Sequence, residues 1–193
     1  MPSENDRTQN DNSVPAKRPA RPTKPKSDTA ASRSPEPSPA NVRRHEAREL
    51  ALQTLYEVDM TDHSPAEVLA RTRSQLQPED ETFAYLELLI GEFNLIRDEI
   101  DGYIRVAAPA FPVAQLANVD RNVLRIATLE LLRHPDVPPK VAINEAIEMA
   151  KRFGGDNSSR FVNGALGAIF SKIQAERAAV TATSARQNDP VST

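Results

Sequence analysis

The sequence contains no cysteine and no tryptophan. Without cysteine the chain has no disulfide, no thiolate nucleophile and no cysteine zinc site, which suits a reducing compartment. No apolar run approaches the length that spans a membrane, and the N-terminus lacks the apolar segment of a secretory signal. These absences favour a soluble cytoplasmic protein that makes no membrane contact.

Glycine is also scarce, with 6 residues against 16 prolines, and many of the prolines lie near the N-terminus. Residues 1–41 are rich in Pro, Lys and Arg and almost free of large apolar side chains, so we expect a disordered tail there. Residues 178–193 lack a core-facing pattern and are expected to form a second disordered tail. One folded domain is therefore expected over residues 42–177.

The charge is unevenly distributed along the chain. Residues 1–44 carry nine Lys/Arg and five Asp/Glu, a net charge of +4, whereas the whole chain has a formal net charge of −3. A basic arm therefore precedes an acidic body, so any contact with nucleic acid must be local.

Apolar residues between positions 42 and 177 recur at helical spacing, and no strand pattern competes. A capping box at Ser64 and Glu67 starts the second helix, Asn118 is expected to cap a later one, and Gly154 or Gly155 is expected to stop another in a left-handed conformation. The expected helical segments are 42–60, one starting at 64, one starting at 78, a short turn at 113–117, 118–134, 138–153 and 158–177. The sequence predicts a compact all-α bundle of about six or seven helices, with the helix starting at 78 in the centre.

Catalytic patterns are missing from this sequence. His45, His63 and His134 lie in different segments, so surface or capping roles outweigh metal ligation. Glu145 and Glu148 lie one turn apart, but the basic residues that follow favour a solvated, self-paired face. There is no phosphate-binding glycine loop and no nucleophile elbow. We therefore expect no catalytic residue, no metal and no cofactor.

Two segments carry candidate RNA-binding residues. Arg43, Arg44 and Arg48 open the first helix, and guanidinium groups suit phosphate contact, although ordinary surface charges are the alternative. Gln53 and Tyr56 fall off the apolar stripe of that helix; an exposed tyrosine can stack on an unpaired base, and a partly buried tyrosine at the helix edge is the alternative.

The second segment, residues 153–161, joins two helices. Its glycines and polar residues are explained by a helix stop and an N-cap, but free N–H groups at a helix start also attract phosphate. The residues here that can contact RNA are Phe153, Asn157, Ser158, Arg160 and Phe161.

Several motifs resemble the NusB family of transcription antitermination proteins. They are Asp120-Arg121-Asn122-Val123-Leu124-Arg125-Ile126-Ala127, Glu130-Leu131, Asp136-Val137-Pro138, Val141-Ala142-Ile143-Asn144-Glu145-Ala146 and Phe161-Val162-Asn163-Gly164. The arginine-rich opening from Arg43 to Tyr56 is also similar, and the resemblance extends from Val42 to Ile173. The sequence departs from the family pattern at Gly167, where an acidic residue is usual, and at Leu129, where an aromatic residue is common.

The resemblance implies an all-α fold of two small subdomains and a non-catalytic protein. Such a protein would bind boxA-type RNA in nascent ribosomal RNA together with the ribosomal protein NusE, and would join RNA polymerase to prevent premature termination. It implies RNA contacts by the two candidate segments, and NusE contacts by Asp120, Arg121 and Leu124.

Two alternatives are a helical domain related to ribosomal RNA cytosine methyltransferases and a protein-only helical adaptor. The first is disfavoured because the catalytic part of those enzymes needs an α/β domain and a cysteine. The sequence leaves open whether the protein is a monomer or a homodimer, what the N-terminal tail does, and which RNA sequence is preferred.

Overall fold

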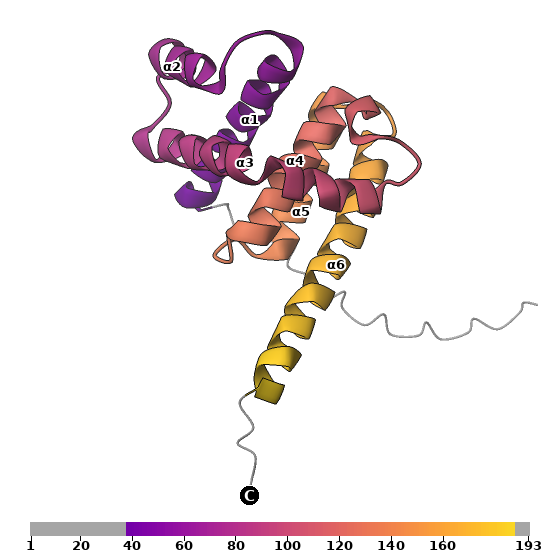
Figure 1. Cartoon of the computed structure of the whole chain (residues 1–193). Coiled ribbons are helices and arrows are strands. Elements are labelled where there is room, and N and C mark those ends of the chain that lie inside the picture. Colours follow the sequence, from indigo (N-terminus) through magenta and orange to yellow (C-terminus); the bar gives the residue numbers. More distant parts are fainter. Residues whose placement is uncertain (1–37, 188–193) are drawn as a thin grey trace, which may run out of the picture. The chain divides into compact units, whose positions relative to one another are not determined.

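The computed structural model describes residues 38–187, which contain six α-helices, one short 3-10 helix and no strand (Figure 1). The predicted all-α class is therefore confirmed. The elements are α1 (Pro39–Met60), α2 (Pro65–Leu76), α3 (Asp80–Ala107), η1 (Val113–Gln115), α4 (Asn118–Arg133), α5 (Pro139–Phe153) and α6 (Ser158–Gln187).

Side chains cap α1 and α2, whereas α3, α4 and α5 start without a side-chain cap, and α3 begins at Asp80 rather than at Pro78. The capping box of α2 is confirmed: Glu67 N–H donates to Ser64 Oγ at 3.3 Å, and Ser64 N–H donates to Glu67 Oε2 at 2.7 Å. α1 begins three residues earlier than expected, because Ser38 caps it and Pro39 fits its first turn. Asn118 is not the cap of α4; it is the first residue of that helix, and Ala117 precedes it.

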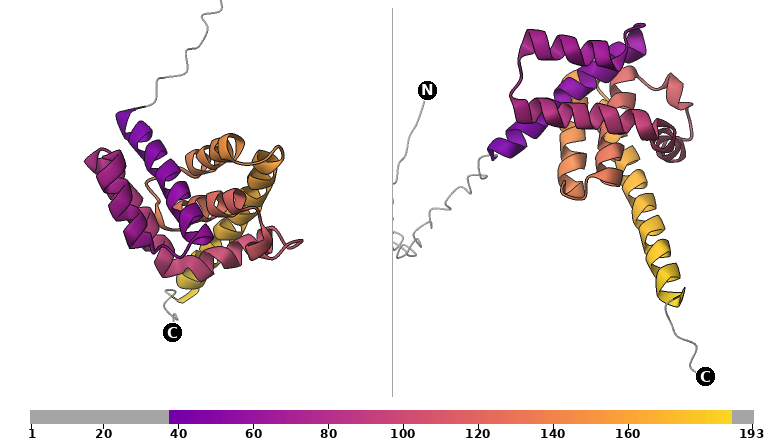
Figure 2. Two further views of the ribbon diagram at one scale, coloured as in Figure 1. Left: turned by 90° about the horizontal axis from the view of Figure 1, so that it is seen from above. Right: turned by 60° about the vertical axis from the view of Figure 1, so that its left-hand side comes forward.

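The centre of the bundle is α4, and the expectation that the helix starting at 78 is central was wrong. Every residue of α4 from Asp120 to Leu131 is buried, and the helix packs against α1, α3, α5 and α6. α3 is half exposed, with Leu95 83 % accessible, and its backbone leaves helical geometry at Ile96. The six helices pack as one compact unit (Figure 2), and one continuous apolar core runs through it, so the two subdomains that the resemblance implied do not separate here.

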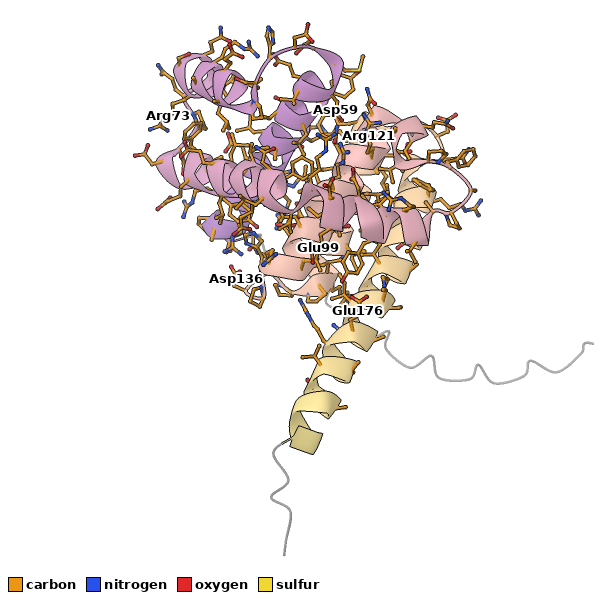
Figure 3. The ribbon with its side chains drawn as sticks, in the orientation of Figure 1. Asp59, Arg73, Glu99, Arg121, Asp136 and Glu176 are labelled. Atoms are coloured by element: carbon orange, nitrogen blue, oxygen red, sulfur yellow. The ribbon has the colours of Figure 1, made fainter. Side chains whose placement is uncertain are left out.

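Buried charged residues tie α4 to the helices around it. Asp59, near the end of α1, accepts hydrogen bonds from Arg121 at 2.9 Å and from Asn122 at 3.0 Å. Arg125 reaches Asp59 at 3.2 Å and Asp101 of α3 at 2.8 Å. Figure 3 shows Asp59 and Arg121 side by side where α1 meets α4. This network fixes the end of α1 relative to α4.

We expect Asp59→Asn to lower stability at neutral pH and to flatten its acid dependence. Burial raises the pKa of Asp59, but hydrogen bonds from Arg121 and Asn122 and the charges of Arg121 and Arg125 outweigh it, so the net shift is downward. A lowered pKa stabilises the fold above the ordinary aspartate value and is lost as pH falls below about 4. Urea unfolding at several pH values measures the slope of the free energy of unfolding against pH. Asp62→Asn, at an exposed position, is the control, and equal slopes in both variants would contradict the prediction.

α6 is longer than predicted and leaves the bundle (Figure 1). It continues to Gln187, so the expectation of a disordered tail starting at 178 was wrong over ten residues. Alanine is the best helix former, and neither glycine nor proline occurs between Gly167 and Pro190 to end the helix. Residues 1–37 and 188–193, which hold most of the predicted tails, lie outside the described residues. No helix within residues 38–187 has the length and apolarity needed to cross a membrane.

Candidate nucleic-acid interface

Three hollows open along the side of α1 that faces α5 and the loop after it. The first, of about 570 Å³, is called the Arg44 hollow, and its lining residues are Asn41, Val42, Arg44, His45, Arg48, Asp136, Val137, Pro138, Val141, Asn144 and Glu145. The second, of about 380 Å³, shares His45 with it. The third, of about 300 Å³, is called the Tyr56 hollow. Its lining residues are Tyr56, Ala117, Asn118, Val119, Asp120, Phe153, Gly154, Gly155 and Ser158. One side of the domain therefore gathers residues from both candidate segments.

Two accessible aromatic rings line the Tyr56 hollow. Tyr56 of α1 is 42 % exposed and Phe153 at the end of α5 is 36 % exposed. Ser158 is buried at the start of α6, and its Oγ accepts a hydrogen bond from Gly155 N–H at 2.9 Å. Candidate residues from two segments that are far apart in the sequence are therefore brought to one place, where both rings can meet a flat ligand.

Close packing at Gly154 gives this loop its shape. Gly154 has an extended backbone with φ −93° and ψ −172°, and no described glycine has a positive φ. The predicted left-handed stop was therefore wrong. A Cβ on Gly154 would lie 2.5 Å from Ser158 Cβ and 2.6 Å from the Ala150 carbonyl oxygen. The chain needs glycine here because α5 ends against the first turn of α6.

The remaining candidates of the loop and Gln53 differ in exposure. Gln53, Asn157 and Arg160 are exposed, so all three side chains can meet a ligand. Asn157 precedes α6, and its carbonyl accepts a hydrogen bond from Phe161 N–H at 3.0 Å. Phe161 is only partly exposed and packs against the core, which gives it mainly a structural role.

Arg44 is held at the surface at the other end of α1. Its Nη2 lies 2.5 Å from Asp136 Oδ2, and its guanidinium carbon lies 5.1 Å from the centroid of the Tyr85 ring. The hydrogen bond from Arg44 lowers the pKa of Asp136. The Arg44 side chain is 35 % exposed, so it is oriented by these contacts and still accessible to a phosphate.

Arg48 is buried, so its predicted direct contact with phosphate was wrong. It is 2 % exposed, and its Nε donates to both oxygens of Glu130, at 2.9 and 3.1 Å. Tyr85 Oη donates to the same carboxylate at 2.6 Å. The sequence contained a signal for this, because Arg48 lies three and seven residues before Ala51 and Leu55 of the buried stripe.

Arg43 lies apart from the hollows. It pairs with Glu81 at 2.9 Å and with Glu79 at 3.5 Å, both at the start of α3. Its side chain is 30 % exposed. Of the three arginines grouped by the sequence, Arg44 alone lines a hollow from an accessible position.

Sequence reasoning missed His45 and Arg152 as parts of this surface. His45 Nδ1 lies 2.6 Å from Glu145 of α5, and its Nε2 lies 3.3 Å from Glu49. Arg152 also pairs with Glu49, and its guanidinium carbon lies 4.9 Å from the Phe153 ring centroid. His45 and Glu49 are one turn apart on α1, which indicates a shared face, but no sequence signal identifies the partners on α5.

The residues expected to face a protein partner are largely internal. Leu124 is fully buried in the core, and its predicted surface role was wrong. Arg121 is 8 % exposed and donates to Asp59, Asn118 and the Ala114 carbonyl, so its surface role was also wrong. Asp120 is 9 % exposed and lines the Tyr56 hollow rather than an open face.

Comparison with known proteins gives a consistent result. The NusB family model matches residues 45–171. A transcription antitermination protein NusB from Dehalococcoides mccartyi is 44 % identical over 135 residues, which cover 70 % of this chain and 94 % of that protein. The corresponding protein from Roseiflexus castenholzii is 46 % identical over 133 residues, which cover 67 % of this chain and 92 % of that protein.

Solved structures share the fold. A T. maritima NusB structure is 32 % identical, with a TM-score of 0.63, and the match covers 66 % of this chain and 90 % of that one. A crystal structure of antitermination factors NusB and NusE in complex with double-stranded RNA has the same fold, with a TM-score of 0.62, 24 % identity, and coverage of 68 % of this chain and 98 % of that one. The family match, the relatives and the fold agree, and the chain therefore belongs to the NusB family.

Proposed function

We propose that this protein is a non-catalytic transcription antitermination factor that binds single-stranded boxA-type RNA. The observation that carries the proposal is the Tyr56 hollow, where two accessible rings from different helices meet a glycine loop and the start of α6. Aromatic rings stack on unpaired bases, and each such contact contributes about 1–3 kcal/mol in single-strand binders. The antitermination role is carried over from the relatives, whose name states it.

The RNA in this proposal lies along the side of α1 that bears the hollows. Tyr56 and Phe153 stack on bases, and Arg44, twelve residues before Tyr56 on α1, contacts a phosphate. Gln53, Asn157, Ser158 and Arg160 lie within or beside this path, and their amide, hydroxyl and guanidinium groups suit base edges and phosphates. Arg48 acts by positioning α1 on α4, and Phe161 by packing α6 on the core.

A basic ribosomal protein of the NusE type completes the proposal. A NusB structure with the same fold contains NusE and RNA, and the net negative charge of this chain suits a basic partner. The assembly would act on RNA polymerase in the cytoplasm, where nascent ribosomal RNA is made. A homodimer that covers the hollows would compete with RNA.

Fluorescence anisotropy with a labelled boxA-type RNA and a scrambled RNA tests this function. We expect Tyr56→Ala to weaken boxA binding about tenfold, within the range for loss of one stacked base. Arg44→Ala should weaken binding to both RNAs. It should also reduce the slope of log affinity against log salt concentration by the amount expected for about one phosphate contact. NusE should raise the boxA affinity of the wild type.

Two variants serve as matched controls. Tyr56→Phe keeps the ring and should bind like the wild type. Arg73→Ala removes an exposed arginine of α2 that pairs with Asp80 outside the hollows, and should change little. Equal, weak binding of all variants to both RNAs would contradict the RNA proposal and favour a protein-only adaptor.

A further inference from the structure

The second of the three hollows lies between the other two. It has a volume of about 380 Å³ and is called the Glu49 hollow; its lining residues are His45, Glu49, Glu148, Met149, Lys151 and Arg152. It shares His45 with the Arg44 hollow, and Phe153 of the Tyr56 hollow directly follows Arg152 in the chain. The three hollows follow the same order along α1 and along α5, so an RNA strand that reaches from Arg44 to Tyr56 crosses the Glu49 hollow.

The basic side chains of the Glu49 hollow are each paired with a carboxylate of the same hollow. Arg152 of α5 pairs with Glu49 of α1. His45 Nε2 lies 3.3 Å from the same oxygen of Glu49, so this carboxylate contacts two potential cations. Lys151 Nζ lies 2.6 Å from Glu148 Oε1. The middle of the RNA path therefore contains groups that suit phosphate, but the protein's own carboxylates already occupy them.

Arg152 is the most accessible of these pairs' cations and is held in place by two groups. Its side chain is 63 % exposed, whereas that of Glu49 is 18 % exposed. Its guanidinium carbon also lies 4.9 Å from the centroid of the Phe153 ring, a contact that does not depend on the carboxylate. A guanidinium is always charged and can donate two parallel hydrogen bonds to a phosphate. Because exposed ion pairs are weak, a phosphate can displace Glu49 from Arg152.

We propose that Arg152 binds an RNA phosphate and that Glu49 competes with this phosphate for the same guanidinium. In the free protein Glu49 holds Arg152. When RNA binds, the phosphate takes the place of the carboxylate, and the Phe153 ring keeps the guanidinium at the surface. Phosphate contacts carry no sequence information, so Glu49 lowers the affinity for RNA of any sequence and leaves selectivity to the stacked bases. The inference rests on the proposed RNA function and adds a phosphate contact and its internal competitor.

The test is a double-mutant cycle between Glu49→Gln and Arg152→Gln, with the labelled boxA-type RNA and the scrambled RNA in fluorescence anisotropy. His45 keeps Glu145, at 2.6 Å, when Glu49 is replaced, so Arg152 is the cation that loses its partner. The cycle cancels the general gain in RNA affinity that follows from removing a negative charge. Glu46→Gln removes a charge from an exposed position three residues earlier on α1 and is the matched control.

We expect Glu49→Gln to raise the affinity for both RNAs about threefold to fivefold, the equilibrium equivalent of one exposed ion pair. Glu46→Gln should raise it less than about twofold, because salt screens a charge that lies off the RNA path. In the Arg152→Gln background, Glu49→Gln should also raise the affinity less than about twofold. Arg152→Gln alone should reduce the slope of log affinity against log salt concentration by about 0.7, the value for one phosphate contact on a single strand.

Four other results would contradict these expectations. Equal gains from Glu49→Gln in both backgrounds, with boxA binding intact, would reduce the effect to general charge repulsion, overturn the competition and leave the proposed function standing. A loss of affinity in Glu49→Gln would also overturn the competition, because the carboxylate would then orient Arg152 for the phosphate. A gain for boxA RNA alone would overturn the phosphate contact and assign the guanidinium to a base edge. No boxA binding by the wild type would overturn the proposed function itself.

Discussion

Glu130→Ala is expected to lower the free energy of unfolding by about 3–5 kcal/mol, the typical result of leaving one member of a buried ion pair alone. Glu130 is 1 % exposed and accepts hydrogen bonds from Arg48 and Tyr85. Without it, Arg48 keeps only Glu145, at 3.5 Å, and the Tyr85 hydroxyl has no acceptor. Urea unfolding followed by circular dichroism measures the change.

Two comparisons separate this effect from a general loss of charge. Glu148→Ala removes an exposed carboxylate that pairs with Lys151, and should cost no more than about 1 kcal/mol. The triple variant Arg48→Met, Glu130→Leu, Tyr85→Phe replaces the whole cluster with apolar groups and should recover most of the lost stability. A Glu130→Ala variant as stable as Glu148→Ala would show that the cluster contributes little.

The Arg48–Glu130 pair also aligns the candidate interface. Arg48 reaches Glu145 of α5 at 3.5 Å, and Glu145 in turn contacts His45 in the Arg44 hollow. α1, α4 and α5 are thereby linked through one connected set of charged side chains, which runs from the buried Arg48–Glu130 pair to the partly exposed Glu145 and His45. The arginine that the sequence assigned to phosphate contact thus supports the position of Arg44, one turn away on the same helix.

The helices were predictable from the sequence because their signals are local. The capping box at Ser64 and the proline that limits α4 after His134 depend on residues a few positions apart, and both were correct. The predicted end of α6 was too early because the residues after 177 have no apolar stripe, and this was interpreted as an absence of helix. An alanine-rich segment without glycine or proline continues as helix without any core contact.

The candidate site was predictable only in part, because burial depends on partners distant in sequence. Tyr56 was identified from its position off the apolar stripe and Phe153 from the segment that joins two helices, and the structure places both at one accessible hollow. Arg48 and Arg121 were taken for surface residues; the position of Arg48 on the buried stripe indicated its burial, but nothing in the sequence indicates Glu130 or Asp59 as the partners.

The loop between α5 and α6 contains two adjacent glycines, of which Gly154 has no room for a Cβ and Gly155 has. Alanine substitutions at the two positions therefore test whether the packing of this loop shapes the Tyr56 hollow. Gly154→Ala is expected to lower the free energy of unfolding by about 1–3 kcal/mol, the usual cost of overpacking. Its Cβ would lie 2.6 Å from the Ala150 carbonyl oxygen, which is held in the backbone of α5. Gly155→Ala meets only Ser158 Oγ, at 3.9 Å, and should change stability by less than about 0.5 kcal/mol.

Relief of the Gly154 clash requires α5 and α6 to separate: rotation of the Ser158 side chain could move its Oγ away, but the Ala150 carbonyl oxygen and Ser158 Cβ are fixed by the backbone. That movement would shift Phe153 and Ser158 relative to Tyr56 and Asp120, which lie on α1 and α4. Gly154→Ala should therefore lose boxA affinity when measured well below its melting temperature, while Gly155→Ala keeps it. Equal RNA affinity in the two variants, with Gly154→Ala alone destabilised, would show that the hollow tolerates displacement of the loop and that its two rings bind RNA without a fixed spacing.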